Sequence, residues 1–436
     1  GSLIAAGGRL IATGPRFSFR DVVLTTATVD IDEIRLQRTR LSPGTVEDEN
    51  QSQAIYKVVS ASFSPTVAEI VKSKVAPPAS WEGEPAIKEH EFSRAVALGL
   101  FDYLRKSRSR GFVISLSGGA DSGGTACLCV LALRFAVGEL GLSGIKKKLS
   151  HIPEVAEAGS IDECIRALVT CVYQSTRNSG ARTLAAAREV ATALGCTFFN
   201  VDVDPLVAGY SELASAAIGE PLSWAKHDVP LQNIQARVRG PFVWMIANLK
   251  GALLLATSNR SEAAVGYTTM DGDTAGGLSP IGGIDKAFLL RWLRWIESGG
   301  LTELGPLQVL SLITSQAPTA ELRPPEASQT DEADLMPYPI LDAIERWAIR
   351  DKKSPLEVFE LLKLEHPDVP AKERALWVRR FFRLWSINQW KRERYAPSFH
   401  LDDENLDPKT WCRFPILSGG YEQELAELDA VLAVSG

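Results

Sequence analysis

A short glycine-containing segment of this sequence has the composition of a phosphate-binding loop. Ser117-Gly118-Gly119-Ala120-Asp121-Ser122 follows the apolar run 112–116 and opens a long apolar stretch that extends to about Leu140. Glycines let backbone N–H groups approach an anion, and the start of a helix adds partial positive charge. Asp121 would repel a polyphosphate unless a divalent cation lay between them, so it predicts bound Mg²⁺. The alternative is a plain glycine turn in which Asp121 and Ser122 only cap the helix.

The loop lacks the GxxxxGK[ST] pattern of ATPases that release the γ-phosphate. Its SGGxDS string resembles the ATP-pyrophosphatase superfamily, whose members cleave ATP between the α- and β-phosphates and adenylate a carboxyl or carbonyl oxygen. GMP synthetase, asparagine synthetase, argininosuccinate synthetase and NAD synthetase are members. The loop therefore implies the type of ATP chemistry and leaves the substrate open.

Three downstream segments resemble NAD synthetases in their order and spacing. The first extends from Leu231 to Lys286 and contains QAR, TSNRSE and GYTTMDGD. The second, Pro318-Thr319-Ala320-Glu321-Leu322, is similar to a mobile loop of that family, and the third, 390–416, resembles the tail of its glutamine-dependent members. The resemblance covers about residues 85 to 420. It implies ATP-dependent amidation of deamido-NAD to NAD through an adenylate, with ammonia as the nitrogen donor.

Individual residues of these segments suit that chemistry. Glu262 follows a strand, where it could share Mg²⁺ with Asp121. Asn233 and Arg237 are four residues apart and would share one helix face toward the second nucleotide. The predicted catalytic residues are Asp121, Asp273 and Lys286, and the predicted metal ligands are Asp121 and Glu262. The resemblance implies ATP contacts from Ser117–Ser122, Thr257, Lys286 and Thr319. It implies deamido-NAD contacts from Asn233, Arg237, Glu262, Tyr267 and Lys391.

An isolated Glu, Lys or Arg is more often a solvated or ion-paired group than a ligand. Order and spacing favour function for Thr257, Glu262, Asp273 and Lys286, whereas Arg239, Arg260 and Asp285 are interpreted as structural. The chain also departs from the short ammonia-dependent NAD synthetases, because Met270 replaces a lysine and Gly277 an acidic residue. Substrate contacts near these positions are expected to differ and to use Lys391 instead.

Apolar strands alternate with helices through the central part of the chain. The strands are expected at 112–116, 167–173, 196–203 and 251–257, with helices at 89–106, 122–140, 181–194 and 238–249. This alternation predicts an α/β fold, a doubly wound parallel sheet covered on both faces. The resemblance implies the Rossmann-like, adenine nucleotide alpha-hydrolase-like version of that fold.

The N-terminal part has a different texture. Residues 1–42 alternate apolar runs and turns, which predicts hairpin-like β structure. They resemble the last strands of the nitrilase-like glutaminase domain of glutamine-dependent NAD synthetases, whose Glu-Lys-Cys set would precede residue 1. Residues 43–84 are interpreted as a linker and 85–436 as the synthetase domain. We expect the chain as given to use free ammonia, or the natural protein to be longer.

Composition excludes several other classes. A formal charge of −6 without a basic run argues against nucleic-acid binding, and the sequence has no uninterrupted membrane-length apolar run. Six scattered cysteines predict free thiols and a cytoplasmic location.

The five histidines show no ligand spacing, and tryptophans 377, 385 and 390 are expected in a core or a subunit contact. The resemblance further implies a homo-oligomer with the dinucleotide at a dimer interface.

Two rival functions stay open at this point. One is another amidating synthetase, such as GMP synthetase, although the segment from Thr257 to Lys286 argues against it. The other is a nucleotide-binding or regulatory module without catalysis.

Overall fold

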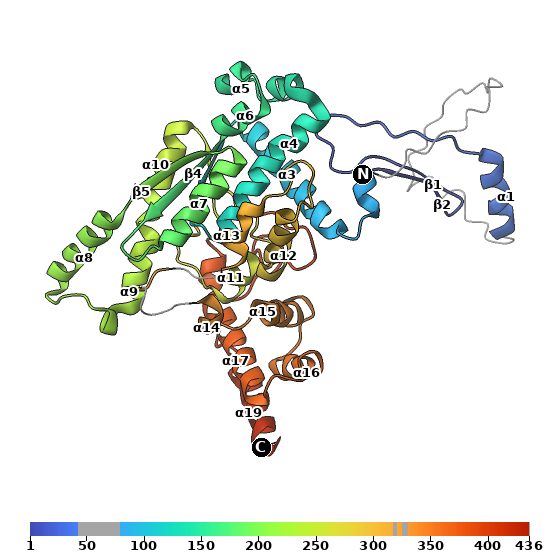
Figure 1. Cartoon of the computed structure of the whole chain (residues 1–436). Coiled ribbons are helices and arrows are strands. Elements are labelled where there is room, and N and C mark those ends of the chain that lie inside the picture. The colour runs from blue at the N-terminus through green and yellow to red at the C-terminus, as the bar shows by residue number, and fades with distance from the viewer. Residues whose placement is uncertain (42–78, 317–320, 325–329, 436) are drawn as a thin grey trace. The chain divides into compact units, whose positions relative to one another are not determined.

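The computed structural model describes residues 1–41, 79–316, 321–324 and 330–435 (Figure 1). The chain divides into two compact units, Gly1–Ile87 and Lys88–Gly436. Residues 42–78 lie outside the described residues and include most of the expected linker 43–84, so the domain boundaries at 42 and 84 stay predictions.

The first unit begins with an antiparallel hairpin of β1 (Leu3–Ala6) and β2 (Arg9–Thr13), turned by Gly7 and Gly8, which both have positive φ. The prediction of further β structure was wrong, because Ile31–Leu41 forms helix α1. Asp30 explains the helix: its side chain accepts the N–H groups of Asp32 and Glu33 at 2.9 and 3.0 Å, as an N-cap does. The short 3₁₀ turn η1 (Ser80–Gly83) follows.

The second unit is built on a four-stranded parallel sheet with the order β5–β4–β3–β6. Its strands are β3 (Phe112–Ser115), β4 (Val169–Ser175), β5 (Thr197–Asp202) and β6 (Leu253–Leu255). Phe112 is paired with Val169 on one side and with Leu253 on the other. All four strands occur where the sequence predicts them, and the fold class is confirmed.

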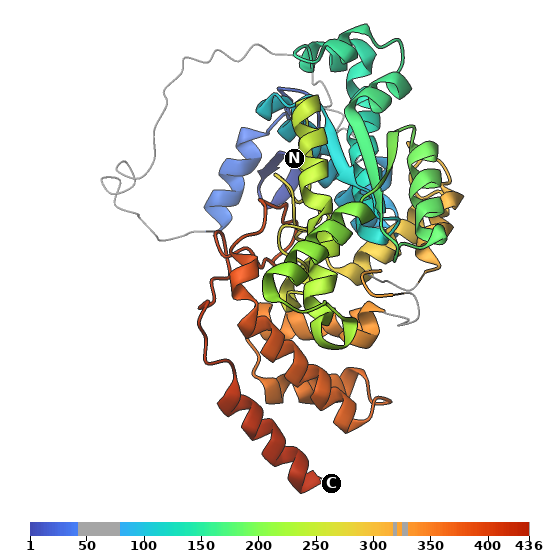
Figure 2. The same ribbon diagram turned by 90° about the vertical axis from the view of Figure 1, so that its left-hand side faces the viewer.

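Helices cover both faces of this sheet (Figures 1 and 2). Helix α10 (Arg239–Lys250) packs Val243 and Ala247 against Val113, Val172 and Leu254 of the strands. Helices α4 (Ala120–Lys148) and α7 (Ala181–Leu194) cover the opposite face. By length and composition α4 could cross a membrane, but its residues from Ala126 to Leu133 are fully buried, as in a core helix.

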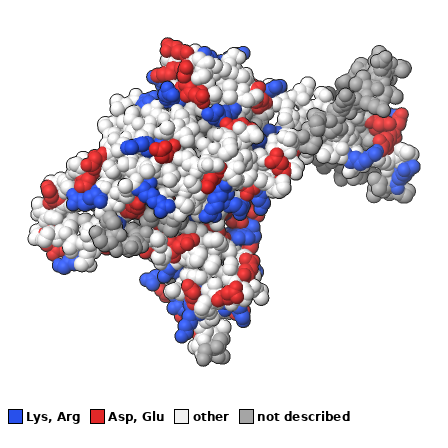
Figure 3. Space-filling view, in the orientation of Figure 1, with Lys and Arg blue, Asp and Glu red and all other residues white. Residues whose placement is uncertain are grey.

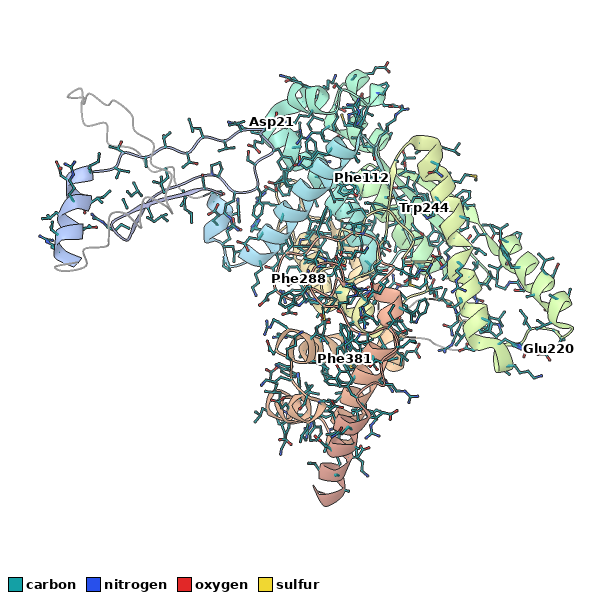
Figure 4. All side chains as sticks on the ribbon, turned by 180° about the vertical axis from the view of Figure 1, so that it is seen from behind. Asp21, Phe112, Glu220, Trp244, Phe288 and Phe381 are labelled. Atoms are coloured by element: carbon teal, nitrogen blue, oxygen red, sulfur yellow. The ribbon has the colours of Figure 1, made fainter. Side chains whose placement is uncertain are left out.

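A second, helical core follows the sheet along the chain. Trp385 and Trp377 are buried there beside Phe381, which Figure 4 labels, so the expected core role holds for these two tryptophans. Trp390 is 39% exposed and does not belong to this core. The helices of this core are α11 (Arg260–Val265), α15 (Tyr338–Glu345), η4 (Arg346–Arg350), α16 (Pro355–Glu365), α17 (Ala371–Ile387) and α19 (Glu422–Ser435).

The remaining helices connect the strands and the two cores. They are α3 (Ile87–Ser107), α5 (Pro153–Glu157), α6 (Ile161–Leu168), α8 (Asp204–Ile218), α9 (Trp224–Arg237), α12 (Lys286–Glu297), η2 (Gln308–Leu310), α13 (Ser311–Thr314), α14 (Asp331–Asp334) and α18 (Gln389–Arg392).

Arg260 of α11 is the centre of a buried ionic cluster. Its guanidinium is paired with Glu345 at 3.0 Å, Asp285 at 3.3 Å, Asp402 at 3.1 Å and Glu404 at 2.8 Å. Burial raises the pKa of Glu345 to about 8, although Arg260 opposes the shift. These contacts agree with the structural interpretation of Arg260 and Asp285.

Arg260→Met is expected to lower the free energy of unfolding by about 3–5 kcal/mol, because it leaves buried carboxylates without their counter-charge. Urea denaturation at neutral pH measures the change. Asp402→Asn is the matched control: the Asp402 side chain is 46% exposed, so the loss should stay below about 1 kcal/mol. An Arg260→Met midpoint equal to that of the unmodified chain would contradict the cluster's structural role.

Candidate functional site

A cavity of about 480 Å³ opens at the carboxyl ends of the strands. Parallel α/β sheets place their ligands at this edge, beyond the strand ends. Its lining combines side chains from four regions that are far apart in the sequence. The predicted residues that line it are Ser117–Ser122, Asn233, Thr257, Glu262, Tyr267, Asp273, Lys286 and Lys391.

Two predicted residues are not among these. The Arg237 side chain is exposed and donates from Nε to the Met270 carbonyl at 3.1 Å, and it does not line the cavity. Thr319 lies outside the described residues. Met270, which replaces a lysine of the short enzymes, is 3% exposed and is also absent from the lining.

The loop Ser117–Ser122 connects β3 to α4 in a conformation that requires glycine. Gly118 has a φ of 84°, and a Cβ added there would lie 2.2 Å from the Thr183 carbonyl oxygen. The Ser122 hydroxyl accepts the Ser117 N–H at 3.1 Å and is 3.0 Å from the Ser117 hydroxyl. Ser122 therefore braces the loop, while its backbone N–H groups stay at the start of a helix, where an anion binds well.

Asp121 and Glu262 converge on one point, which the Lys286 ammonium occupies. Lys286 Nζ donates to Asp121 Oδ2 and, at 3.1 Å, to Glu262 Oε1. The two carboxylates come from the first turns of α4 and α11, and Lys286 is the first residue of α12. This charge cluster, Asp121–Lys286–Glu262, unites three of the residues predicted from sequence.

Asn259 is a site residue that the sequence analysis did not single out. Its Nδ2 donates to Asp121 Oδ1 at 2.8 Å, and its Oδ1 accepts the Glu262 N–H at 2.9 Å as the N-cap of α11. The available signal was its place as a cap three residues before Glu262. Asn259 thereby binds the Asp121 carboxylate directly and fixes the helix turn that carries Glu262.

The cluster combines two carboxyl groups with one ammonium group. Burial and the neighbouring Asp121 raise the pKa of Glu262 to about 8, although Lys286 opposes the shift. The attraction of Asp121 and Glu262 outweighs burial and raises the pKa of Lys286 above its usual range. Asp331 also lines the cavity; it is buried, and its Oδ1 has no hydrogen-bond partner in the described part of the chain. These carboxylates would therefore attract an additional cation to the site.

These residues fit a magnesium ion better than a structural metal. Among the described residues, no three His, Cys, Asp or Glu side chains are grouped closely enough to hold a metal. Two convergent carboxylates are, however, the number that Mg²⁺ commonly takes from a protein, with phosphates and water supplying the other ligands. Asp121 and Glu262 are the side chains that would hold it.

Other polar groups of the cavity lining bind each other or the backbone outside the charge cluster. Asp273 accepts the Thr269 N–H at 2.7 Å. Asn233 of α9 accepts the Thr269 hydroxyl at 3.2 Å. Lys391 donates to the carbonyls of Gly266 and Thr268 at 2.6 and 2.8 Å, which places the C-terminal tail at the cavity as expected.

Glu321 and Leu322, the described end of the predicted mobile loop, form part of the cavity wall. Glu321 accepts the Gly180 N–H at 3.2 Å and the Thr183 hydroxyl at 2.9 Å. The Leu322 carbonyl accepts Gln235 Nε2 at 2.6 Å. Glu321 and Gln235 were quoted in motifs but received no role, because their partners are distant in sequence.

Comparisons with known proteins agree with this geometry. The family model described as NAD synthase matches residues 92–393. The human glutamine-dependent NAD(+) synthetase is 30% identical over 430 residues, covering 94% of this chain and 60% of the human protein. The Saccharomyces cerevisiae enzyme of the same name is 28% identical over 473 residues, covering 98% of this chain and 64% of the yeast protein.

A solved structure gives the same result. The crystal structure of a glutamine-dependent NAD(+) synthetase from Cytophaga hutchinsonii is 46% identical, with a TM-score of 0.69, and the match covers 78% of this chain and 56% of that one. The chain thus spans about 60% of the length of the curated relatives that it matches. The matched region contains the loop Ser117–Ser122, the charge cluster and Lys391, and the chain belongs to the NAD synthase family.

Proposed function

We propose that this chain amidates deamido-NAD to NAD at the expense of ATP, releasing AMP and pyrophosphate. The observation that supports this most directly is the convergence of Asp121 and Glu262 on Lys286 beside the loop Ser117–Ser122. A divalent cation and an ammonium group beside an anion-binding loop suit a reaction in which negative charge grows on departing pyrophosphate.

Each residue has a role that follows from its place. The loop and the N-terminus of α4 bind the triphosphate of ATP, and Thr257 donates a hydrogen bond to the nucleotide. Mg²⁺, when bound, offsets phosphate charge. A nicotinate carboxylate oxygen attacks the α-phosphorus while the bond to the β-phosphate breaks, and Lys286 stabilises the pyrophosphate that leaves.

The second step replaces AMP with nitrogen. Ammonia attacks the acyl carbon of the adenylate, the bond to the AMP oxygen breaks, and the nitrogen loses a proton. Asp273 is proposed to accept a hydrogen bond from this nitrogen, because its carboxylate lines the cavity. Asn233, Tyr267 and Lys391 are proposed to orient deamido-NAD in the cavity.

Ammonia is proposed as the nitrogen species that reacts at this site. The relatives in the comparisons are named glutamine-dependent, and a glutaminase domain would supply ammonia in such proteins. We propose that the present chain accepts free ammonia in the cavity described above.

A cytoplasmic location is likewise proposed, supported by six free cysteines.

The purified chain with ATP, Mg²⁺, deamido-NAD and ammonium is expected to form NAD, AMP and pyrophosphate in equal amounts. Chromatography of the nucleotides and an enzyme-coupled pyrophosphate assay measure them. Xanthylate in place of deamido-NAD controls for a GMP synthetase activity. Turnover of xanthylate alone would favour that rival, and nucleotide binding without any product would favour a non-catalytic module.

Lys286→Met is expected to strengthen Mn²⁺ binding about tenfold in the absence of nucleotide, because the competing ammonium leaves Asp121 and Glu262. The same variant should turn over slowly, since pyrophosphate loses its cationic contact. Titration of the Mn²⁺ electron paramagnetic resonance signal measures binding directly. Asp121→Asn is the comparison variant and should weaken Mn²⁺ binding; unchanged affinity in both variants would refute the cation site.

A homodimer is proposed from the surface of α8 and α10. No residue of α8 is buried, yet Leu206, Tyr210 and Leu213 form an apolar stripe at helical spacing. Trp244, labelled in Figure 4, is 39% exposed on α10. On the face shown in Figure 3, charges of both signs are mixed among uncharged residues. An apolar surface next to the predicted dinucleotide residues of α9 suits a second copy of the chain.

Leu213→Glu is expected to convert the dimer into a monomer, because it places a charge in the apolar stripe of α8. Analytical ultracentrifugation gives the mass of the particle. Leu364→Glu serves as a matched control, since Leu364 is a similarly exposed leucine on α16. Equal masses for the unmodified chain and both variants would rule out this interface.

A further inference from the structure

Four cationic side chains line the cavity, and three of them have partners. Lys286 is bound by Asp121 and Glu262, and Lys391 donates to two carbonyl groups. The guanidinium of Arg323 donates to both carboxylate oxygens of Asp228, at 3.0 and 2.9 Å. The fourth is Arg239, whose guanidinium has neither an ion pair nor a hydrogen bond in the described part of the chain.

The backbone of Arg239 is fixed at the carboxyl edge of the sheet. Arg239 is the first residue of α10, and its carbonyl accepts Gln174 Nε2 at 2.9 Å. Gln174 Oε1 in turn accepts the Ser115 hydroxyl at 3.3 Å. Residues at the carboxyl ends of β3 and β4 therefore fix the backbone of Arg239. Ser115 and Gln174 line the same cavity as Arg239, so the backbone from which the Arg239 side chain extends lies at the cavity wall.

A comparison with other buried arginines shows that this arrangement is unusual for the protein. Arg260 is surrounded by four carboxylates, and Arg392 donates to the carbonyls of Ala264 and Trp385. Arg374 donates to the Val369 carbonyl. Arg374 Nε also lacks a hydrogen-bond partner, but this arginine donates through Nη1, whereas no nitrogen of the Arg239 guanidinium has an acceptor among the described residues.

The nearest acidic groups are already engaged. Burial lowers the pKa of Arg239, and the attraction of Tyr173, Glu321 and Asp273 is too weak to reverse the shift. Glu321 accepts hydrogen bonds from Gly180 and Thr183, and Asp273 accepts the Thr269 N–H. A partly buried guanidinium without an acceptor is costly to keep unless a ligand supplies the anion.

We propose that Arg239 binds a phosphate group of a nucleotide held in this cavity. The planar fork of a guanidinium matches two phosphate oxygens, and the substrates of the proposed reaction carry several such groups. The inference rests on the proposed function for the identity of these nucleotides. The phosphate comes either from the triphosphate of ATP or from the pyrophosphate bridge of deamido-NAD. This assignment replaces the structural interpretation of Arg239 drawn from the sequence.

Isothermal titration calorimetry of the full chain tests the proposal, with Arg239→Met and Arg239→Lys titrated separately with ATP–Mg²⁺, pyrophosphate–Mg²⁺, deamido-NAD and NAD. Arg239→Met is expected to bind one nucleotide about 10- to 100-fold more weakly, with partial recovery in Arg239→Lys. Arg134→Met is the matched control: Arg134 Nε is also shielded and unpartnered, but this arginine pairs with Asp162 and does not line the cavity.

The ligands separate the possible sources. Weaker binding of ATP and pyrophosphate supports the proposal and identifies ATP as the source of the phosphate. An equal loss for deamido-NAD and NAD supports it with the dinucleotide as the source, because both carry the same phosphates. A loss for deamido-NAD alone overturns it in favour of the nicotinate carboxylate, and unchanged affinities overturn it outright.

Two further measurements keep these results unambiguous. Circular dichroism melting of Arg239→Met and Arg239→Lys shows whether each variant is folded. If Arg239→Met is unfolded, the affinities of the conservative Arg239→Lys variant are used in its place. Turnover of the unmodified chain is measured in the same buffer. If that chain makes no NAD but binds nucleotides more tightly than Arg239→Met, the proposed function fails while the assignment of Arg239 stands.

Discussion

The structure of the site depends on bringing Asp121, Glu262 and Lys286 into contact. Each stands in the first turn of a different helix, so three helix N-termini, those of α4, α11 and α12, meet at one place. Helix N-termini carry partial positive charge, which favours the two carboxylates and disfavours the ammonium. The ammonium is held there because the carboxylates outweigh both this field and its burial. A parallel sheet is what makes such a meeting possible, since its strands all end at the same edge.

Helix α11 transmits this arrangement to the rest of the second unit. Within four consecutive residues, Asn259 binds Asp121, Arg260 enters the ionic cluster, Ser261 accepts the Lys286 N–H and contacts Asp342, and Glu262 binds Lys286. One turn of helix therefore fixes the charge cluster on one side and the C-terminal helices on the other. The helical core is linked to the charge cluster at the edge of the sheet, because Glu345 of α15 pairs with Arg260, the residue next to Asn259.

The sequence predicted what depends on local pattern and missed what depends on distant partners. The four strands and the loop Ser117–Ser122 could be found because apolar runs and a glycine motif carry their own signal. Asn259 escaped notice because its partner Asp121 is 138 residues away. Residues 31–41 were misread because the apolar positions near them suggested strands, whereas the cap at Asp30 starts a helix. The proposed role of Arg239 could not be predicted from the sequence for the opposite reason. What distinguishes this arginine is a missing partner, which no sequence pattern displays.

Charge in the cavity also bears on how a polyanion enters it. Six acidic and four basic side chains line the cavity, and three of the four basic groups are engaged by the protein. A bare triphosphate would therefore meet net repulsion near Asp121 and Glu262. A triphosphate that carries its own divalent cation brings the missing positive charge to those carboxylates, while its oxygens reach the backbone N–H groups of the loop. Under the proposed function, the acidic side chains of the cavity favour the metal complex of the nucleotide over the free nucleotide. Preference for the metal complex over the free nucleotide requires more acidic than basic side chains at the site, although an anionic ligand alone would favour the reverse.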